Sequence, residues 1–293
     1  EIHEIIRNTN QRPAQTGKPL YPEEIMAYPN LCEEIESISR TVDGFSYRMD
    51  ILRAKNRGEN CPLFINIHGG GFIGPHREND TYFSAYMADQ IHGITVDLDY
   101  TLSDAAPYPV ALHQCMDALD YVAEHANAWG ASAKDISVGG YSAGGALTAA
   151  MGICCAERGG FVPKLQILCY PPLEYRIPDQ YKIDAYDRQI GMERCKAFAD
   201  LYFDDKKENF EDIHNSPLYA PREILAKQPK TLILSAGLCN FRYEDEDYAI
   251  CLADAGAEVI LKRFPEASHG FIPHFMDGWK EAADLMVREI LEK

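Results

Sequence analysis

Positive charge and long apolar runs are both scarce in this sequence. Its 293 residues include 28 Lys and Arg against 45 Asp and Glu, which gives a formal net charge of −17. Nucleic acid and anionic membrane surfaces repel a strongly acidic protein, so we expect neither as a partner. No stretch reaches the roughly 18 consecutive apolar residues that a membrane-spanning helix requires. We therefore expect a soluble protein that acts on an uncharged small molecule, although a local site can oppose the sign of the whole.

Motifs for secretion, zinc binding and dithiol chemistry are also missing. Residues 1–15 are mixed and charged, without the apolar core of a secretion signal. The nine cysteines are scattered and include no C-x-x-C pair, which argues against zinc sites and dithiol redox chemistry. We expect buried free thiols, a reducing compartment such as the cytoplasm, and neither a metal nor a cofactor. Whether the chain forms a homo-oligomer stays open.

Short apolar runs alternate with helical patterns along most of the chain. The apolar runs lie at residues 63–67, 94–98, 136–138, 165–168, 232–234 and 259–261. The helical patterns lie at residues 82–90, 109–128, 143–157, 244–255 and 278–291. Runs that are apolar throughout are typical of parallel strands covered on both faces. We therefore predict an α/β fold in which residues 1–293 form one domain, with a mostly parallel, doubly wound sheet and helices on both faces.

The N-terminal part of the chain departs from this alternation. Residues 45–51 alternate between apolar and polar side chains, which predicts a half-exposed antiparallel strand. Residues 1–40 have the composition of a polar arm, with short helical pieces expected at 22–28 and 32–39.

A second departure is the segment 171–229, which is rich in Pro, Tyr and Asp. Helices are expected near 191–202 and 221–226, and the segment interrupts the alternation of strand and helix. We expect a small lid formed by about residues 1–40 and 171–229. Its tyrosines are candidates for lining an acyl or alcohol pocket: Tyr170, Tyr175, Tyr181 and Tyr186.

The residues from Gly140 to Gly144 have the pattern G-x-S-x-G. They follow a predicted strand and precede the helical pattern at 143–157, which is the strand–turn–helix context of a nucleophile elbow. The two glycines avoid collisions with the adjacent strand and helix, and the helix start favours developing negative charge. We therefore predict that Ser142 is a nucleophile. The alternative, a glycine-rich helix start without catalysis, is disfavoured by these flanks.

A glycine-rich loop, His68-Gly69-Gly70-Gly71-Phe72, directly follows the apolar run at 63–67. Glycines allow backbone N–H groups to point at a substrate oxygen without interference from side chains, as in an oxyanion hole. A flexible glycine turn is the alternative, which the nearby elbow motif disfavours. We interpret His68 as a structural residue that shapes the loop.

His269 follows the last predicted strand of the chain. A loop in that position reaches the carboxyl edge of the sheet, where Ser142 is expected. Serine first and histidine last is also the chain order of α/β-hydrolases. We predict that His269 is the general base. His274, from the same loop region, is the alternative, and the other histidines are expected to have packing or surface roles.

Three blocks, H-G-G-G-F, G-Y-S-A-G-G and S-H-G-F, resemble the hormone-sensitive-lipase-like branch of the α/β-hydrolases. The likeness extends over about residues 63–275. It implies a carboxylesterase that forms an acyl-enzyme, with no cofactor and with short-chain esters, acetyl esters included, as substrates. It also implies that the oxyanion is held by three backbone amides, those of Gly70, Gly71 and Ala143.

The segment after the next-to-last strand departs from the family pattern. The family has its catalytic aspartate there, and this chain has Cys239. A neutral thiol is a poor acceptor for an imidazole N–H and cannot offset the charge of an imidazolium. Three residues are alternatives for the missing acid: Asn240, Glu244 and Glu174. The choice stays open, and the intact nucleophile, base and loop favour an acid relocated elsewhere in the chain.

Two other functions fit the same fold. A peptidase would use identical groups, but such enzymes usually carry a further recognition domain, for which this chain has no room. A non-catalytic or weakly active ligand-binding protein would explain the missing aspartate. The retained Ser142 and His269 argue against that alternative, so the sequence predicts a serine esterase.

Overall fold

One sheet of eight strands runs through the computed structural model, which describes residues 20–177, 192–204 and 206–292. The strands are β1 (Glu36–Val42), β2 (Phe45–Arg53), β3 (Cys61–Ile67), β4 (Ile94–Asp99), β5 (Ala131–Tyr141), β6 (Leu165–Cys169), β7 (Lys230–Ala236) and β8 (Val259–Phe264). Their order across the sheet is β1-β2-β4-β3-β5-β6-β7-β8. β2 pairs antiparallel with β1 and β4, and the other pairings are parallel. The predicted α/β fold with a mostly parallel sheet is confirmed.

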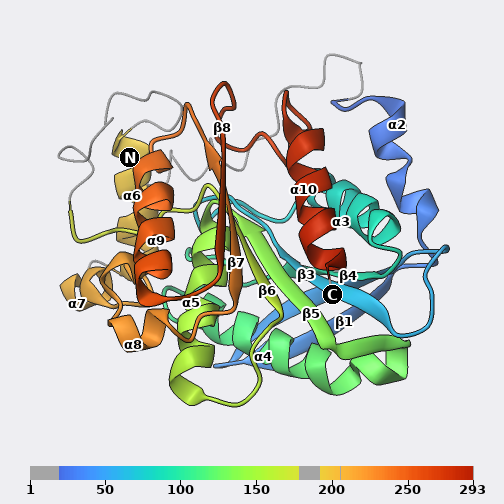
Figure 1. The fold of residues 1–293 in the computed structure, drawn as a ribbon, viewed down its shortest axis with the longest axis horizontal. Helices are drawn as coiled ribbons and strands as arrows, with labels where there is room; N and C mark the ends of the chain where they lie inside the picture. The colour runs from blue at the N-terminus through green and yellow to red at the C-terminus, as the bar shows by residue number, and fades with distance from the viewer. Residues whose placement is uncertain (1–19, 178–191, 205, 293) are drawn as a thin grey trace.

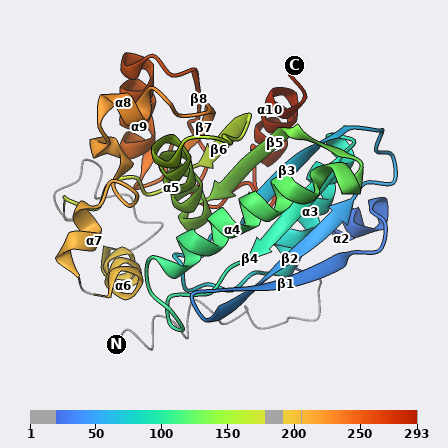
Figure 2. The same cartoon turned by 90° about the horizontal axis from the view of Figure 1, so that it is seen from below.

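Helices cover both faces of this sheet (Figure 1). The longer ones are α3 (Glu78–Gln90), α4 (Val110–His125), α5 (Ala143–Arg158), α9 (Arg242–Ala255) and α10 (Trp279–Leu291). α3 contacts α10 on one face, and α4 contacts α5 on the other (Figure 2). All five coincide with helical patterns of the sequence, which confirms the doubly wound arrangement.

The strand β1 corrects two expectations for the N-terminal part of the chain. Residues 32–39 were expected to be helical, whereas residues 36–40 belong to the sheet and thus not to a lid. β1 is an edge strand with alternating exposed and half-buried side chains, so its apolar pattern is weak. Short helices do precede it, α2 (Glu23–Met26) and the 3₁₀ helix η1 (Tyr28–Leu31), and η1 contacts α3. Residues 1–19 lie outside the described residues.

The segment after β6 contains α6 (Met192–Phe203), α7 (Lys207–Glu211), the 3₁₀ helix η4 (Pro217–Tyr219) and α8 (Arg222–Leu225). The helices expected near 191–202 and 221–226 are confirmed by α6 and α8. α6 packs against the loop after β3, where the ring of Tyr202 stacks on Phe72 with a centroid distance of 3.7 Å. Tyr181 and Tyr186 lie outside the described residues.

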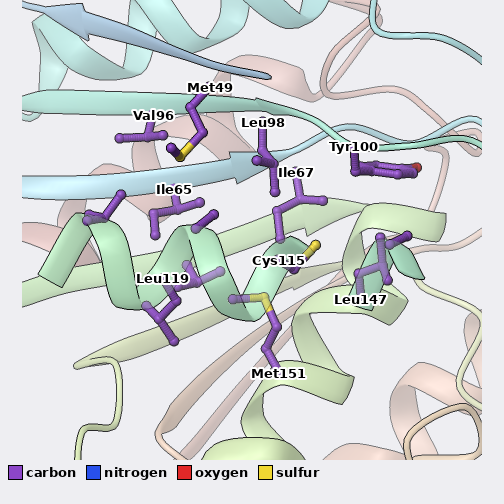
Figure 3. Close-up of a cluster of buried hydrophobic side chains, with 14 of the residues drawn as sticks. Met49, Ile65, Ile67, Val96, Leu98, Tyr100, Cys115, Leu119, Leu147 and Met151 are labelled. Atoms are coloured by element: carbon purple, nitrogen blue, oxygen red, sulfur yellow. The ribbon is translucent and has the colours of Figure 1, made fainter. Parts of the chain in front are cut away.

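A buried hydrophobic cluster holds α4 and α5 against the sheet (Figure 3). Strands β2, β3 and β4 contribute Met49, Ile65, Ile67, Val96 and Leu98, while the helices contribute Cys115, Leu119, Leu147 and Met151. Full burial of one such large apolar side chain stabilises a fold by about 1.5–3 kcal/mol. The packing therefore fixes α5, and with it the residue that precedes the helix, relative to the strands.

The structure also bears on membrane spans, metal sites and free thiols, which the composition had addressed. Among the described residues, no helix combines the length and apolarity that crossing a membrane demands. Within those same ranges, His, Cys, Asp and Glu side chains form no group of three or more that could hold a metal ion. All nine cysteines are free and most are buried, as their scattered spacing predicted.

Candidate active site

Ser142 occupies the sharp turn between β5 and α5. Its backbone has φ 52° and ψ −119°, a left-handed conformation that is strained for a residue with a side chain. A Cβ atom at Gly140 would lie 2.4 Å from the carbonyl carbon of Gly144, and one at Gly144 would lie 2.1 Å from the Ile67 carbonyl oxygen. Both positions therefore exclude any side chain. This strained and tightly packed turn has the geometry of a nucleophile elbow.

His269 lies in the loop that follows β8. Its Nε2 is 2.9 Å from the Oγ of Ser142, and its ring packs edge-on against Tyr170 and Phe241. When Nδ1 carries the ring proton, Nε2 accepts the hydrogen bond from the serine hydroxyl. His274 instead has its Nδ1 3.3 Å from the hydroxyl of Tyr21. The fold thus brings together Ser142 and His269, the pair that the sequence selected.

Cys239, in the loop after β7, lies on the other side of the His269 ring. Its buried Sγ is 3.0 Å from His269 Nδ1, and the same sulfur accepts the backbone N–H of Phe241 at 3.4 Å. Sulfur is a weak acceptor, and an uncharged thiol gives no electrostatic support to a protonated imidazole. A continuous series of side chains therefore runs from Ser142 through His269 to Cys239, with a thiol where the resemblance implies a carboxylate.

The two glutamates considered as replacements for the acid contact backbone amides. Oε2 of Glu244 accepts the amides of Leu173 and Glu174 at 2.8 and 3.0 Å. Oε1 of Glu174 accepts the amide of Ile177 at 2.9 Å and also that of Arg176. Both carboxylates thus order the chain just after β6. These contacts give no support to a relocated acid, and Asn240 is adjacent to the cysteine whose sulfur contacts the ring.

The electrostatic environment of His269 disfavours its protonated form. Burial, and then the neighbouring His274 and Arg194, lower the pKa of His269 to about 3. A carboxylate beside Nδ1 would act in the opposite direction, because negative charge stabilises the imidazolium. The ring is therefore neutral, and able to accept a proton, over an unusually wide pH range.

A pH–rate profile tests this environment. Protonation of His269 removes its ability to act as a base, so a lowered pKa moves the loss of activity to lower pH. We expect kcat/KM for an uncharged ester to stay nearly constant from about pH 8 down to about pH 5, whereas an ordinary histidine would give half-loss near about pH 6.5. Enzyme held at each pH and re-assayed near neutrality provides the control for denaturation. An acid limb at or above the ordinary histidine value would contradict the prediction.

The glycine loop after β3 lies directly against the elbow. Gly70 and Gly71 have φ 116° and 62°, values that favour glycine. A Cβ atom at Gly69 would lie only 3.4 Å from the Cβ of Ser142. Ala143 is the first residue of α5, and the amides of a first helical turn have no acceptor within the helix. The glycine loop and the start of α5 thus both lie beside the serine.

The side chain of His68 packs against this glycine loop and helps to hold its conformation. Its Nδ1 donates to the carbonyl of Gly69 at 2.7 Å, and its ring stacks on Tyr100 with a centroid distance of 4.3 Å. Burial lowers the pKa of His68 to about 3, so the ring is neutral at ordinary pH. The contacts agree with a structural role, as the sequence suggested.

A cavity of about 280 Å³ opens beside Ser142. Among the residues expected at the site, it is lined by Gly70, Gly71, Ser142, Tyr170, His269 and His274. Tyr175 packs against Phe203 instead. The cavity also contains side chains that sequence reasoning missed: Arg77, Asn79, Asp80, Arg194 and Phe198. These residues belong to no motif, and their only sequence signal is proximity to the glycine loop or to the lid segment.

Comparison with known proteins agrees with the fold. A family model described as the alpha/beta hydrolase fold matches residues 64–273. Esterase LipI of Mycobacterium tuberculosis is 30% identical over 72% of this chain and 66% of its own length. Carboxylic ester hydrolase LipN of the same organism is 31% identical over 77% of this chain and 61% of its own length. The chain thus spans less than two thirds of these curated relatives.

Solved structures extend the likeness to nearly the whole chain. An esterase of Pyrobaculum calidifontis superposes with a TM-score of 0.82 and 23% identity, over 99% of this chain and 92% of that one. At this identity the likeness establishes the fold. Together with the family match over residues 64–273, it shows that the chain belongs to the alpha/beta hydrolase fold family, whose hormone-sensitive-lipase-like branch its motifs resemble.

Proposed function

We propose that this protein is a serine esterase that hydrolyses small carboxylic esters through an acyl-enzyme. The observation that carries the proposal is the 2.9 Å contact between Ser142 Oγ and His269 Nε2, beside the glycine loop and its cavity. The names of the two mycobacterial relatives, an esterase and a carboxylic ester hydrolase, support an ester as the substrate.

Acylation begins when Ser142 Oγ attacks the ester carbonyl carbon and its proton passes to His269 Nε2. The negative charge on the carbonyl oxygen is stabilised by the amides of Gly70, Gly71 and Ala143. The carbon–oxygen bond to the alcohol then breaks, and the alcohol leaves with the proton from His269. Water attacks the acyl-enzyme by the same route, which releases the carboxylic acid and restores Ser142.

Cys239 is the third member of this arrangement in our proposal, as a positioning residue. A hydrogen bond from Nδ1–H to Sγ selects the tautomer in which Nε2 is free to accept the serine proton. The sulfur orients the ring but contributes no negative charge to stabilise the imidazolium that forms during attack. Proton transfer is therefore less favourable than in a triad with aspartate.

We also propose that α6, from the described part of the segment 171–229, forms the lid over the cavity; residues 178–191 and 205 lie outside the described residues. Arg194 and Phe198 of α6 support this assignment, since both line the cavity beside Ser142. A Cβ atom at Gly71 would lie 2.2 Å from the Phe198 ring, so α6 closes directly over the glycine loop. A lid this close to the serine leaves little room for a long acyl chain.

A chain-length series tests both the reaction and the size of the site. The cavity volume of about 280 Å³ lies just below the range of about 300–1,000 Å³ that is typical of ligand sites. We expect kcat/KM to be highest for p-nitrophenyl acetate or butyrate and at least about tenfold lower for the decanoate. A maximum at decanoate would contradict the small pocket. Failure to hydrolyse any member above the background rate would contradict the esterase itself.

A further inference from the structure

The glycine loop beside Ser142 folds back on itself before the chain enters α3. The backbone amide of Gly74 donates to the carbonyl of Gly70 at 2.8 Å. A Cβ atom at Gly70 would lie 2.8 Å from the Gly74 carbonyl oxygen, so the two backbones pack directly against each other. Gly70 is one of the proposed oxyanion donors. Because glycine has no Cβ atom to restrict its backbone, the surroundings of this turn must fix the direction of the Gly70 amide.

A buried ion pair lies two residues beyond Gly74. Nε2 of His76 is 2.7 Å from Oδ2 of Asp97, and the two side chains are 9% and 0% exposed. Asp97 belongs to β4, which pairs with β3. Its other oxygen, Oδ1, accepts the side-chain amide of Asn66 at 3.1 Å, and Asn66 is its partner residue on β3. One carboxylate thus connects the strand that precedes the loop with the residue that follows it.

The two ends of the loop also contact each other. His68, the first residue after β3, and His76 pack edge to face with a ring centroid distance of 5.7 Å. Pro75, whose ring fixes its φ, joins His76 to Gly74. The base of the loop is therefore closed by two histidines and one aspartate. A displacement of His76 would pass directly to Gly74 and so to the turn that contains Gly70.

His76 and Asp97 are both charged at neutral pH. Burial opposes the charged form of His76, but the carboxylates of Asp97, Asp80 and Asp99 outweigh it and raise the pKa of His76 to about 9. Burial likewise opposes ionisation of Asp97, and the contacts with His76 and Asn66 outweigh it and lower the pKa of Asp97. Separation of a buried ion pair leaves each charge without its partner, so the pair resists being pulled apart.

We propose that the ion pair between Asp97 and His76 positions the glycine loop so that the Gly70 amide can stabilise the oxyanion. The inference rests on the proposed esterase function and adds two positioning residues to it. Neither His76 nor Asp97 is among the described residues that line the cavity. Their effect on catalysis therefore passes through the loop and not through contact with the ester.

Asp97→Asn and His76→Gln each remove one charge of the pair. An oxyanion donor acts on the transition state and not on the bound ester, so kcat for p-nitrophenyl acetate should fall at least about tenfold while KM changes less than about threefold. Loss of a whole donor would cost about 10²–10³-fold in kcat. The smaller loss is expected because the backbone amide of Ser103 also donates to the Phe72 carbonyl at 2.8 Å and holds another part of the loop.

A tetrahedral analogue separates positioning from a general loss of structure. With a trifluoromethyl ketone, Ser142 Oγ bonds to the carbonyl carbon, its proton passes to His269, and the carbonyl oxygen becomes an oxyanion. The inhibition constant should rise in each variant by about the factor by which kcat/KM falls. A smaller folded fraction would lower kcat without changing the inhibition constant. The matched control is His113→Gln, which breaks an exposed contact with Asp43 and should retain both wild-type values.

The double variant His76→Leu/Asp97→Val covers the case in which a single variant does not fold. Apolar residues in place of a buried ion pair are often neutral for stability or stabilising, but they cannot hold the loop as the pair does. We expect a folded protein, verified by far-UV circular dichroism and thermal unfolding, with kcat lowered at least about tenfold and a weaker complex with the ketone.

Folded single or double variants whose kcat and inhibition constant stay within about twofold of wild type would overturn the inference. A rise in KM at unchanged kcat would overturn it as well, because it would show an effect on ester binding and not on the oxyanion. In both cases the variants still hydrolyse esters, so the proposed function stands. Absence of ester hydrolysis by the wild type would instead overturn the proposed function.

Discussion

The Ser142→Ala variant is expected to lose hydrolysis of short p-nitrophenyl esters while it folds normally. Removing the nucleophile eliminates the acyl-enzyme route, and in a well-studied serine protease the corresponding loss in kcat is about 10⁶-fold. The residual rate over water would come from the oxyanion donors and from binding alone. Alanine keeps the Cβ atom at the strained turn, so the backbone at φ 52° is preserved.

A suitable control for this variant is Ser39→Ala, which removes an exposed hydroxyl from the edge strand β1. It should retain the wild-type kcat and KM. Both variants are to be compared by steady-state kinetics and by thermal unfolding. Near-wild-type turnover by a folded Ser142→Ala variant would show that another residue is the nucleophile.

The Cys239→Asp variant is expected to increase kcat at least about tenfold. In a serine protease, replacing the triad aspartate by asparagine lowers kcat by about 10⁴-fold, so restoring a carboxylate should recover part of such a loss. Two donors already point at this position, His269 Nδ1 at 3.0 Å and the Phe241 amide at 3.4 Å from the present sulfur. The new charge also raises the pKa of His269, which moves the acid limb of the pH–rate profile to higher pH.

Cys239→Ser separates charge from hydrogen bonding, since a hydroxyl accepts the Nδ1–H without adding charge. It should not reproduce the increase in kcat. An unchanged or lower kcat for Cys239→Asp, with an unmoved acid limb, would indicate that another carboxylate already serves His269. In that case Glu174→Gln or Glu244→Gln would lower kcat by orders of magnitude. Their contacts with backbone amides predict an effect on thermal stability instead.

The strands and helices of the central sheet could be predicted because their physical causes are local. A strand covered on both faces is apolar throughout, and this pattern located β3 to β7. The edge strand β8 has mostly half-buried and exposed side chains, and it was located by the short apolar run at residues 259–261. The edge strand β1 lacks the pattern, and it was predicted partly as a helix. A signal was nevertheless present, because Asp43-Gly44 is a typical hairpin turn and both residues have positive φ.

The site residues could be predicted where they belong to contiguous sequence motifs. Ser142 and the glycine loop have such motifs, and chain order was sufficient to select His269. The role of Cys239 depends on which atom lies beside Nδ1 of His269, and this is a matter of three-dimensional geometry. From the order of residues in the sequence alone, we predicted that a carboxylate elsewhere in the chain contacts the ring. Arg77 and Arg194 come together only because α6 docks over the glycine loop, which no local pattern encodes.

Covalent labelling by a fluorophosphonate probe, read by intact mass and peptide mapping, is the most direct test of an activated serine. Such a probe reacts only with a serine whose hydroxyl is deprotonated by a neighbouring base and whose developing oxyanion is stabilised. The proposed mechanism predicts one adduct, on Ser142, which is absent in Ser142→Ala and forms far more slowly in His269→Gln. A folded wild-type protein that stays unlabelled would contradict the mechanism and identify the chain as a non-catalytic binding protein of the same fold.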